Sequence, residues 1–344
     1  MINLKNVKLF KREPKEIPIF FATDDNYIPF LDVAVRSMIE NASKKYKYVI
    51  NVLNTGLKEE NMQKVKLLEN ENFTINFVNI TDYIEPIRSR LKNVYHFSVV
   101  MYYRLFIESM FPQYSKVIYL DCDIVVLGDI SKLYNTILGN NLVAAVREQI
   151  ICNSPVFSDY TQRAMGIDAY HYFNSGILLM NLDKFRKERI EDKFVYLVNK
   201  YNFDLVDPDQ AYLNVLCKGK IKFLQTGWNK ESLPEDCEGK MNIAHYALYK
   251  KPWQYDDVIN GEYFWHYAKQ SPFYDRILEV RASFDDVKKA QKEQANEEIA
   301  THSTQIANSE KNIFNTLFKK EDLLSKLKFD SDALDVFDLE KVKR

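Results

Sequence analysis

Two aspartates separated by a single residue, Asp121 and Asp123, lie within an apolar and β-branched stretch of the chain, residues 116–126. In extended backbone, side chains two residues apart point to the same side, so both carboxylates are expected to face one point. Two like charges held together favour a divalent cation, because without one a carboxylate tends to take up a proton. The position at the end of a buried strand favours a metal or phosphate site, since open α/β sheets bind ligands there.

The tripeptide Asp-x-Asp is common, and this chain contains two further copies, at residues 207–209 and 330–332. The motif by itself is therefore weak evidence of a site. What favours the copy at 121–123 is the apolar strand that leads into it.

The elements that must position these carboxylates alternate between strands and helices, which is typical of parallel βαβ units. Residues 17–283 show no internal repeat and no change of composition, which predicts a single α/β domain. The aromatic segment 149–171 is expected to be loop-rich and able to close over a substrate. Strands are expected at 17–22, 48–53, 73–78, 116–126, 142–146, 172–181 and 221–224, and helices around 31–39, 58–70, 97–110, 129–133 and 209–214.

The composition is that of an ordinary globular protein, with 344 residues, 46% of them hydrophobic and 28% charged. A net charge of -1 gives no basic field, so nucleic acid is not expected as a partner. Charges interrupt every apolar run, and neither a signal peptide nor a membrane span is predicted. The cysteines form no CxxC motif, which favours free thiols in a reducing compartment and a cytoplasmic location; they are Cys122, Cys152, Cys217 and Cys237.

Both ends of the chain differ from the central domain. Residues 1–16 form a Lys-rich arm, and residues 284–344 are expected to form a helical C-terminal extension. Within this extension, apolar residues recur at helical spacing among lysines over 311–329. One alternative is a helix that docks on its own domain or on another subunit, which would be self-association. The other is an interfacial helix in peripheral contact with the inner face of a membrane, its lysines toward anionic headgroups.

Several stretches, taken in their order along the chain, resemble family 8 of the retaining glycosyltransferases, which includes bacterial lipopolysaccharide glucosyl- and galactosyltransferases. The resemblance covers about residues 17–255. It implies a GT-A fold, in which a Rossmann-like, mixed and mostly parallel sheet flanked by helices binds a nucleotide-sugar at its strand ends. The stretches are Ala22-Thr23-Asp24-Asp25-Asn26-Tyr27, Tyr103-Arg104-Leu105, Asp121-Cys122-Asp123, Tyr172-Phe173-Asn174-Ser175-Gly176, Asp209-Gln210 running into Leu213-Asn214, His245, and Lys251-Pro252-Trp253.

The resemblance implies a metal site formed by Asp121, Asp123 and the distant His245. Two carboxylates and one imidazole, with phosphate oxygens completing an octahedron, suit Mn²⁺ best and Mg²⁺ next. Such a metal would neutralise the charge that develops on a departing diphosphate. The alternative for His245 is a core histidine on a strand.

The resemblance also implies how a UDP-sugar would be held. Ala22 and Asp24 would meet the uracil, Tyr27 would stack on it, and Asn26 would reach the ribose. Asp121 would bind the diphosphate through the metal ion, and Lys251 would pair with it as a point charge. The alternative for residues 24–26 is a helix cap, and for Lys251 a solvated lysine. One position departs from the family pattern: Leu248 stands where a glycine usually lets the backbone approach the phosphate.

Around the sugar, the resemblance implies roles for Arg104, Asn174, Asp209 and Gln210. Arg104 and Asp209 would hold hydroxyl groups through charge-assisted hydrogen bonds. Gln210 would lie near the anomeric carbon, where an amide is a poor nucleophile and argues against a covalent glycosyl-enzyme. Same-face substitution through an ion-pair-like transition state is the expected route. The alternative for residues 209–210 is N-capping of the helix that follows Pro208.

Together these expectations describe a metal-dependent, retaining transfer of glucose or galactose from a UDP-sugar to a glycan or lipid-linked acceptor, as in bacterial lipopolysaccharide biosynthesis. A rival from another class is a non-catalytic protein that binds UDP-sugars or glycans on the same fold. A second rival is a nucleotidyltransferase, which should carry a Gly-rich pyrophosphate loop after the first strand. Residues 23–26 contain no glycine, which disfavours it.

Overall fold

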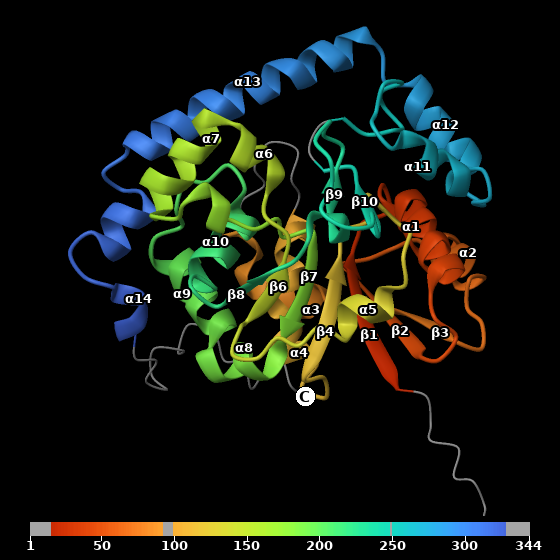
Figure 1. The fold of residues 1–344 in the computed structure, drawn as a ribbon, viewed down its shortest axis with the longest axis horizontal. Helices are drawn as coiled ribbons and strands as arrows, with labels where there is room; N and C mark the ends of the chain where they lie inside the picture. The colour runs from red at the N-terminus through yellow and green to blue at the C-terminus, as the bar shows by residue number, and fades with distance from the viewer. Residues whose placement is uncertain (1–14, 92–98, 248–249, 328–344) are drawn as a thin grey trace, which may run out of the picture.

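A mixed sheet of seven strands forms the centre of the molecule (Figure 1). A computed structural model describes residues 15–91, 99–247 and 250–327 of the chain. The strand order is β3-β2-β1-β4-β7-β6-β8. The strands are β1 (Glu16–Ala22), β2 (Lys47–Asn54), β3 (Phe73–Asn79), β4 (Lys116–Leu120), β6 (Val143–Ala145), β7 (Ile177–Asn181) and β8 (Ile221–Phe223).

The pairing within this sheet is mostly parallel. β1 lies parallel to both β2 and β4, β2 to β3, and β6 to β8. Only β7 runs against its neighbours, β4 and β6. The expected mixed, mostly parallel Rossmann-like sheet is confirmed, and it matches the GT-A architecture implied by the resemblance.

The stretch 116–126 is not one strand, as the sequence pattern predicted. It is divided into β4 and β5 (Ile124–Val126), which belong to different sheets. β5 pairs antiparallel with β10 (Ile243–His245), and β10 pairs parallel with β9 (Lys230–Glu231). Residues 121–123 therefore form the crossing between two sheets, and the argument from extended backbone does not apply to them.

Helices cover the sheet, and the prediction for residues 149–171 was wrong. That segment is mostly helical because Pro155 begins a helix and buried Tyr160, Ala164 and Met165 anchor it to the core. The helix expected around 97–110 consists of a 3₁₀-helix over residues 99–106 and a short α-helix over residues 107–110. The helices are α1 (Ile28–Asn41), α2 (Glu59–Lys66), α3 (Thr81–Arg88), η1 (Val99–Phe106), α4 (Ile107–Met110), α5 (Ile130–Tyr134), α6 (Gln149–Asn153), α7 (Pro155–Tyr160), η2 (Thr161–Met165), η3 (Ala169–His171), α8 (Leu182–Glu188), α9 (Ile190–Lys200), α10 (Pro208–Leu216), η4 (Thr226–Trp228), α11 (Gly261–Ala268), α12 (Tyr274–Ala282), α13 (Asp286–Asn308), η5 (Phe314–Phe318) and α14 (Leu323–Lys326).

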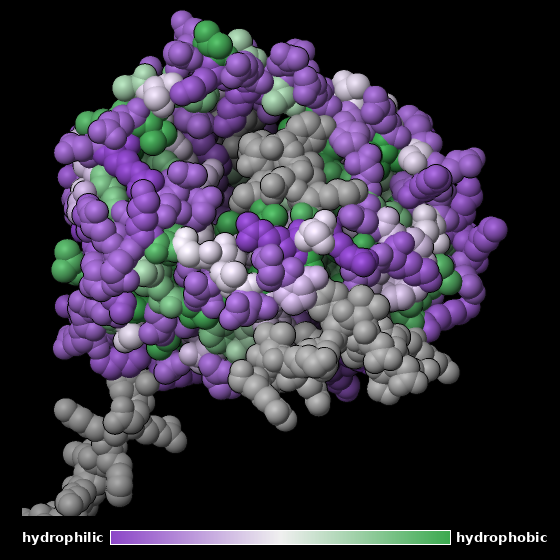
Figure 2. Space-filling view, turned by 180° about the vertical axis from the view of Figure 1, so that it is seen from behind, coloured by the Kyte–Doolittle hydropathy of each residue, from purple (hydrophilic) through white to green (hydrophobic). Residues whose placement is uncertain are grey.

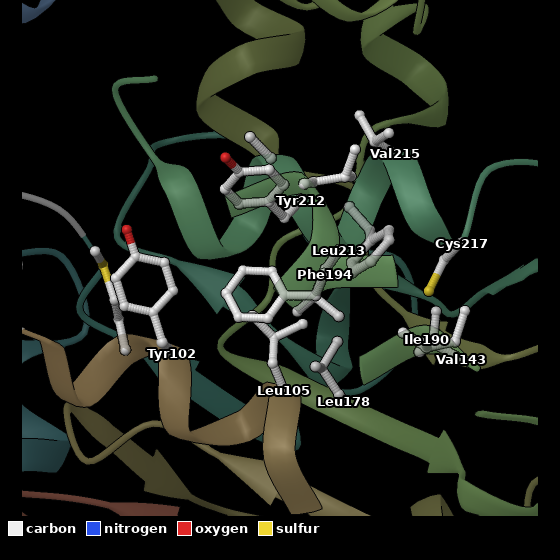
Figure 3. Packing of buried hydrophobic residues seen from close by; sticks show 14 of the residues in the cluster. Tyr102, Leu105, Val143, Leu178, Ile190, Phe194, Tyr212, Leu213, Val215 and Cys217 are labelled. Atoms are coloured by element: carbon white, nitrogen blue, oxygen red, sulfur yellow. The ribbon is translucent and has the colours of Figure 1, made fainter. Parts of the chain in front are cut away.

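The largest apolar cluster joins η1, α9 and α10 to the sheet. Figure 3 shows Phe194 of α9 between Tyr102 and Leu105 of η1 and Tyr212 of α10. The rings of Phe194 and Tyr212 meet edge to face, with centroids 5.3 Å apart. Burial of such side chains contributes about 1.5–3 kcal/mol each, so the positions of η1 and α10 are fixed by the core.

The C-terminal extension docks on its own domain. α13 runs over the molecule from α12 and packs against α7 (Figure 1). Beyond α13, Ile313, Leu317 and Leu324 are buried in the largest apolar cluster. Docking on the same chain, one of the two alternatives for residues 311–329, thus describes them up to residue 327. The arm at residues 1–14 and the end at 328–344 lie outside the described part of the chain.

The face of the molecule seen from behind in Figure 2 is largely hydrophilic where its residues are described. In the view from behind, hydrophobic side chains are scattered among polar ones (Figure 2). Among the described helices, none combines the length and the apolar character needed to span a bilayer.

Candidate active site

A cavity of about 370 Å³ opens at the C-terminal ends of β1 and β4. This is the edge of an α/β sheet where ligands bind. All twelve residues predicted from the sequence line it, although they come from stretches spread over more than 200 positions. They are Ala22, Asp24, Asn26, Tyr27, Arg104, Asp121, Asp123, Asn174, Asp209, Gln210, His245 and Lys251.

Asp121, Asp123 and His245 meet because the chain crosses from one sheet to the other. Asp121 follows β4, and β5 carries Asp123 to β10, whose register pairs His245 with Ile124. The backbone N–H of Tyr246 donates to the carbonyl of Asp123, at 2.9 Å, which fixes this register. Each of the three side chains offers one ligand atom, and these atoms all lie within 4.8 Å of one another. The donor set of two carboxylates and an imidazole fits a divalent ion such as Mn²⁺.

Gly176 lies against the three candidate metal ligands, and its lack of a side chain leaves space for them. A Cβ atom at this position would lie 2.5 Å from Cε1 of His245 and 2.8 Å from Oδ2 of Asp121. Its backbone carbonyl accepts a hydrogen bond from the N–H of Asp121, at 2.8 Å. The absence of a side chain at residue 176 is therefore a geometric requirement of the three-ligand cluster.

The charge on Asp123 is held by its neighbours. Burial alone would raise the pKa of Asp123, but Lys251 and His245 more than offset this, and the pKa lies well below its ordinary value. Lys251 donates to Oδ2 of Asp123, and Nε2 of His245 lies 3.3 Å from Oδ1. Lys251 is buried, so it is not the solvated lysine of the alternative.

Arg104 links the metal-ligand cluster to the sugar side of the cavity. Its Nη2 donates to Oδ1 of Asp121 at 2.9 Å, and its Nε lies 3.3 Å from Oδ2 of Asp209. Nη1 donates to the carbonyl of Ser175, and the guanidinium lies over the ring of Tyr119, at 4.3 Å from its centroid. Arg104 therefore organises both carboxylates. Burial raises the pKa of Asp209 to about 6, although Arg104 opposes this.

Gln210 is held at both ends of its amide group. Its Oε1 accepts the backbone N–H of Ser175 at 2.8 Å. Its Nε2 lies 3.2 Å from Oδ2 of Asp207 and 3.3 Å from Oε2 of Glu148. Asp209 also binds Ser175, through the hydroxyl group at 3.2 Å. Both side chains are thus turned into the cavity, and neither acts as the helix cap of the alternative.

The turn at residues 24–27 closes the other end of the cavity. Oδ1 of Asp24 accepts the backbone N–H groups of Asn26 at 2.9 Å and Tyr27 at 3.1 Å. These bonds form a turn before α1 that shapes the rim of the cavity. They are not the helix cap of the alternative, because the N-cap of α1 is Tyr27 and no side chain caps this helix. Tyr27 is 39% exposed and lines the cavity, so its side chain offers aromatic surface to a ligand there. It rests edge-on against Phe30, which stacks on Trp253.

A comparison with known sequences decides the family. The sequence profile of glycosyl transferase family 8 matches residues 18–257, well over half of the chain. The chain belongs to glycosyl transferase family 8.

Individual relatives agree with this family 8 assignment. A Haemophilus influenzae protein that carries the name of a glycosyltransferase is 30% identical over 249 residues, covering 72% of each chain. The lipopolysaccharide 1,2-glucosyltransferase of Escherichia coli (strain K12) is 27% identical over 255 residues, covering 68% of this chain and 72% of the relative. The chain thus has lipopolysaccharide glycosyltransferases among its homologues.

Solved structures agree as well. The galactosyltransferase LgtC, in complex with donor and acceptor sugar analogs, aligns with a TM-score of 0.63 at 27% identity, covering 74% of this chain and 96% of that one. The bifunctional glycosyltransferase WbbM aligns with a TM-score of 0.68 at 24% identity, covering 79% of this chain and 53% of that longer chain. The first likeness supports family and fold, and the second supports the fold alone.

Several residues that line or support this family 8 site were not predicted. Ser175 and Gly176 lie inside a stretch that was recognised, and Asp207 lies in a second Asp-x-Asp tripeptide, so a signal existed for them. Glu148, Asn229 and Glu231 had none, because these isolated residues reach the site only in the folded chain. Glu231 pairs with His245 in the sheet, and Glu148 and Asn229 bind the side chain of Asn174. Burial raises the pKa of Asp207 to about 7. The one departure from the family pattern, Leu248, lies outside the described residues.

Proposed function

We propose that this family 8 glycosyltransferase transfers glucose or galactose from a UDP-sugar to a glycan or lipid-linked acceptor, with retention at the anomeric carbon and with a divalent metal ion. The observation that carries the proposal is the convergence of Asp121, Asp123, His245 and Lys251 in a single cavity. A diphosphate is the ligand that needs both a divalent ion and a buried lysine.

The donor would lie along the cavity from Tyr27 to Gln210. Tyr27 would stack on the uracil, Ala22 and Asp24 would meet its edge, and Asn26 would reach the ribose. A free ring face beside short polar groups suits a base and its ribose.

The diphosphate would lie between the carboxylate cluster and Lys251. The residues that would hold Mn²⁺, or alternatively Mg²⁺, are Asp121, Asp123 and His245, and the bound ion would supply charge neutralisation for the leaving diphosphate. Lys251 would add a point charge on the same side. Lys251 is also the present partner of Asp123, so it would shift toward the phosphate when the cluster is occupied.

The sugar would meet Arg104, Asn174, Asp209 and Gln210. In the proposed step, the bond from the anomeric carbon to the phosphate oxygen breaks, and the acceptor oxygen forms a bond to that carbon on the same face. The departing phosphate oxygen takes the proton of the acceptor hydroxyl, so charge and atoms balance. The Gln210 amide, fixed by Ser175 and Glu148, would stabilise the oxocarbenium character without forming a bond to it.

This chemistry is proposed for residues 17–283, with the arm at 1–16 and the extension at 284–344 as additions to the domain. The family 8 profile ends at residue 257, and the packing of α13 and residues 313–324 against the domain supports a stabilising place for the extension.

A donor screen tests the proposal. Release of UDP from UDP-glucose and UDP-galactose is measured with Mn²⁺, with Mg²⁺ and after chelation. We expect turnover of one hexose donor that chelation abolishes. Binding of the donor with no slow hydrolysis or transfer would instead support the non-catalytic binding protein.

A variant of Gln210 sharpens the test. Gln210→Ala is expected to keep the affinity for UDP while transfer falls about 10²-fold, because the group acts on the transition state. Gln63→Ala, on the exposed face of α2, is the matched control and should behave as the wild type. Equal loss of UDP affinity and transfer would contradict the role given to Gln210.

A further inference from the structure

Asn229 lies behind the candidate metal ligands and belongs to none of the predicted sets. It stands between the turn Thr226–Trp228 and β9, and it is fully buried. Its side chain contacts two site residues at once: Nδ1 of His245 at 2.8 Å and Oδ1 of Asn174 at 2.9 Å. Its backbone carbonyl accepts Nε2 of Gln149 at 2.7 Å, so the residue is also held from α6.

The orientation of both amide groups follows from one backbone donor. The N–H of Gly176 can only donate, and it lies 2.8 Å from the side chain of Asn174. The atom that receives it must therefore be the oxygen, Oδ1, which leaves Nδ2 of Asn174 to donate to Oε2 of Glu148 at 2.7 Å. The second group on Oδ1 of Asn174 is the Asn229 amide, which must present its nitrogen there.

The orientation of the Asn229 amide determines which ring nitrogen of His245 carries a proton. With Nδ2 of Asn229 turned to Asn174, the atom facing His245 is the acceptor Oδ1. A ring nitrogen 2.8 Å from an acceptor has to carry a proton, so Nδ1 is the N–H of the ring. Nε2, the other ring nitrogen, lies 3.3 Å from Oδ1 of Asp123. In the neutral ring Nε2 carries the lone pair, which a metal ion bound between the two groups would accept.

We propose that Asn229 is a positioning residue that selects the Nδ1–H tautomer of His245 and aims the lone pair of Nε2 at the metal position. The chain of contacts runs from Gly176 N–H through Asn174 and Asn229 to His245. This inference rests on the metal site of the proposed function. Metal-bound histidines commonly gain orientation and basicity from such a partner, whose loss costs about 10–100-fold in metal affinity.

Two substitutions separate this role from a merely structural one. Asn229→Leu removes the acceptor for His245, whereas Asn229→Asp keeps an acceptor there; both lose the donation to Asn174. Mn²⁺ binding in the presence of UDP is measured by electron paramagnetic resonance on folded protein. We expect Asn229→Leu to bind Mn²⁺ about 10–100-fold more weakly and Asn229→Asp to stay close to the wild type. Equal weakening of both variants would overturn the proposal.

A measurement on the wild type keeps the test independent of how the variants fold. Nitrogen NMR of ¹⁵N-histidine protein with Mg²⁺ and UDP reports which ring nitrogen carries the proton, and His245→Gln identifies the signal among the five histidines. A protonated Nδ1 and an unprotonated Nε2 are expected, and the reverse tautomer would overturn the inference. Absence of saturable Mn²⁺ binding to the wild type would instead contradict the metal in the proposed function.

Discussion

Two pairs of acidic residues in this molecule contrast in what surrounds them. Asp121 and Asp123 lie at the cavity, where Arg104, Lys251 and His245 face them. Glu108 and Glu191 lie in the core, where the neighbours are mainly backbone and hydroxyl groups. At the cavity, Lys251 and His245 hold the pKa of Asp123 below its ordinary value despite burial.

In the core pair, burial dominates. Oε1 of Glu108 accepts the backbone N–H of Glu191 at 2.6 Å, and Oε1 of Glu191 accepts the hydroxyl of Tyr83 at 2.5 Å. The second oxygen of each glutamate is buried without a hydrogen-bond partner. Burial raises the pKa of Glu108 to about 7, and burial together with Glu108 raises the pKa of Glu191 to about 8.

The contrast teaches that a shifted pKa does not by itself mark a functional site. The pKa values of the core pair are raised because both carboxyl groups are buried, and neither residue lines the cavity of the candidate site. The cavity pair is kept charged and is placed where a ligand can enter. Substitution of the cavity pair should therefore change activity, whereas substitution of the core pair should change stability.

The largest effect is expected from Asp123→Asn. Removing this charge should abolish Mn²⁺ binding and lower hexose transfer at least about 10²–10³-fold, because a group that stabilises developing charge is lost. Glu191→Gln is the matched control from the core pair and should transfer at close to the wild-type rate. Comparable turnover of Asp123→Asn and wild type would remove the metal assignment.

An intermediate effect is expected from Gly176→Ala. The added Cβ would collide with His245 and Asp121, so Mn²⁺ affinity should fall at least about 10-fold, as it does when ligands are displaced. Gly261→Ala is the control, since its Cβ would meet nothing closer than 3.5 Å. If calorimetric titration with Mn²⁺ and UDP gave the same affinity for both variants, the cluster would not be the metal site.

The smallest effect concerns stability and pH. Burial raises the pKa of Glu191 in the folded state to about 8, above its ordinary value of 4.5. The contribution of Glu191 to the free energy of unfolding is therefore fully present below about pH 4.5 and is lost as the pH rises through 8. Glu191→Gln avoids that loss and should be more stable than the wild type at pH 8, on the order of 1–3 kcal/mol.

Denaturant unfolding at pH 5 and pH 8 measures this difference. The advantage of Glu191→Gln should be small at pH 5 and grow toward pH 8. A constant difference at the two pH values would show that the core pair does not titrate as the structure implies.

Much of the fold was predictable because local patterns carry it. The buried strands 17–22, 48–53 and 73–78 match β1, β2 and β3 to within one or two residues, since apolar runs between polar turns are strong signals. The segment 149–171 was missed because its helices are short and depend on burial of Tyr160 and Met165, which sequence periodicity does not reveal.

The site was predictable to the extent that its residues lie in recognisable stretches. The family resemblance predicted which residues lie beside Asp121 and Asp123, but it did not predict why these residues converge. The chain leaves one sheet after Leu120 and enters another, and no local pattern in residues 116–126 indicates this. Asn229 and Glu148 act through contacts with distant residues, so only the folded chain identifies them.

The most direct test of the account is the binding of Mn²⁺ to the wild-type protein with and without UDP. Electron paramagnetic resonance follows the free ion as protein is added. The account predicts one saturable Mn²⁺ site per chain that UDP tightens and that Asp123→Asn abolishes. Absence of saturable binding, or binding that Asp123→Asn leaves unchanged, would contradict it.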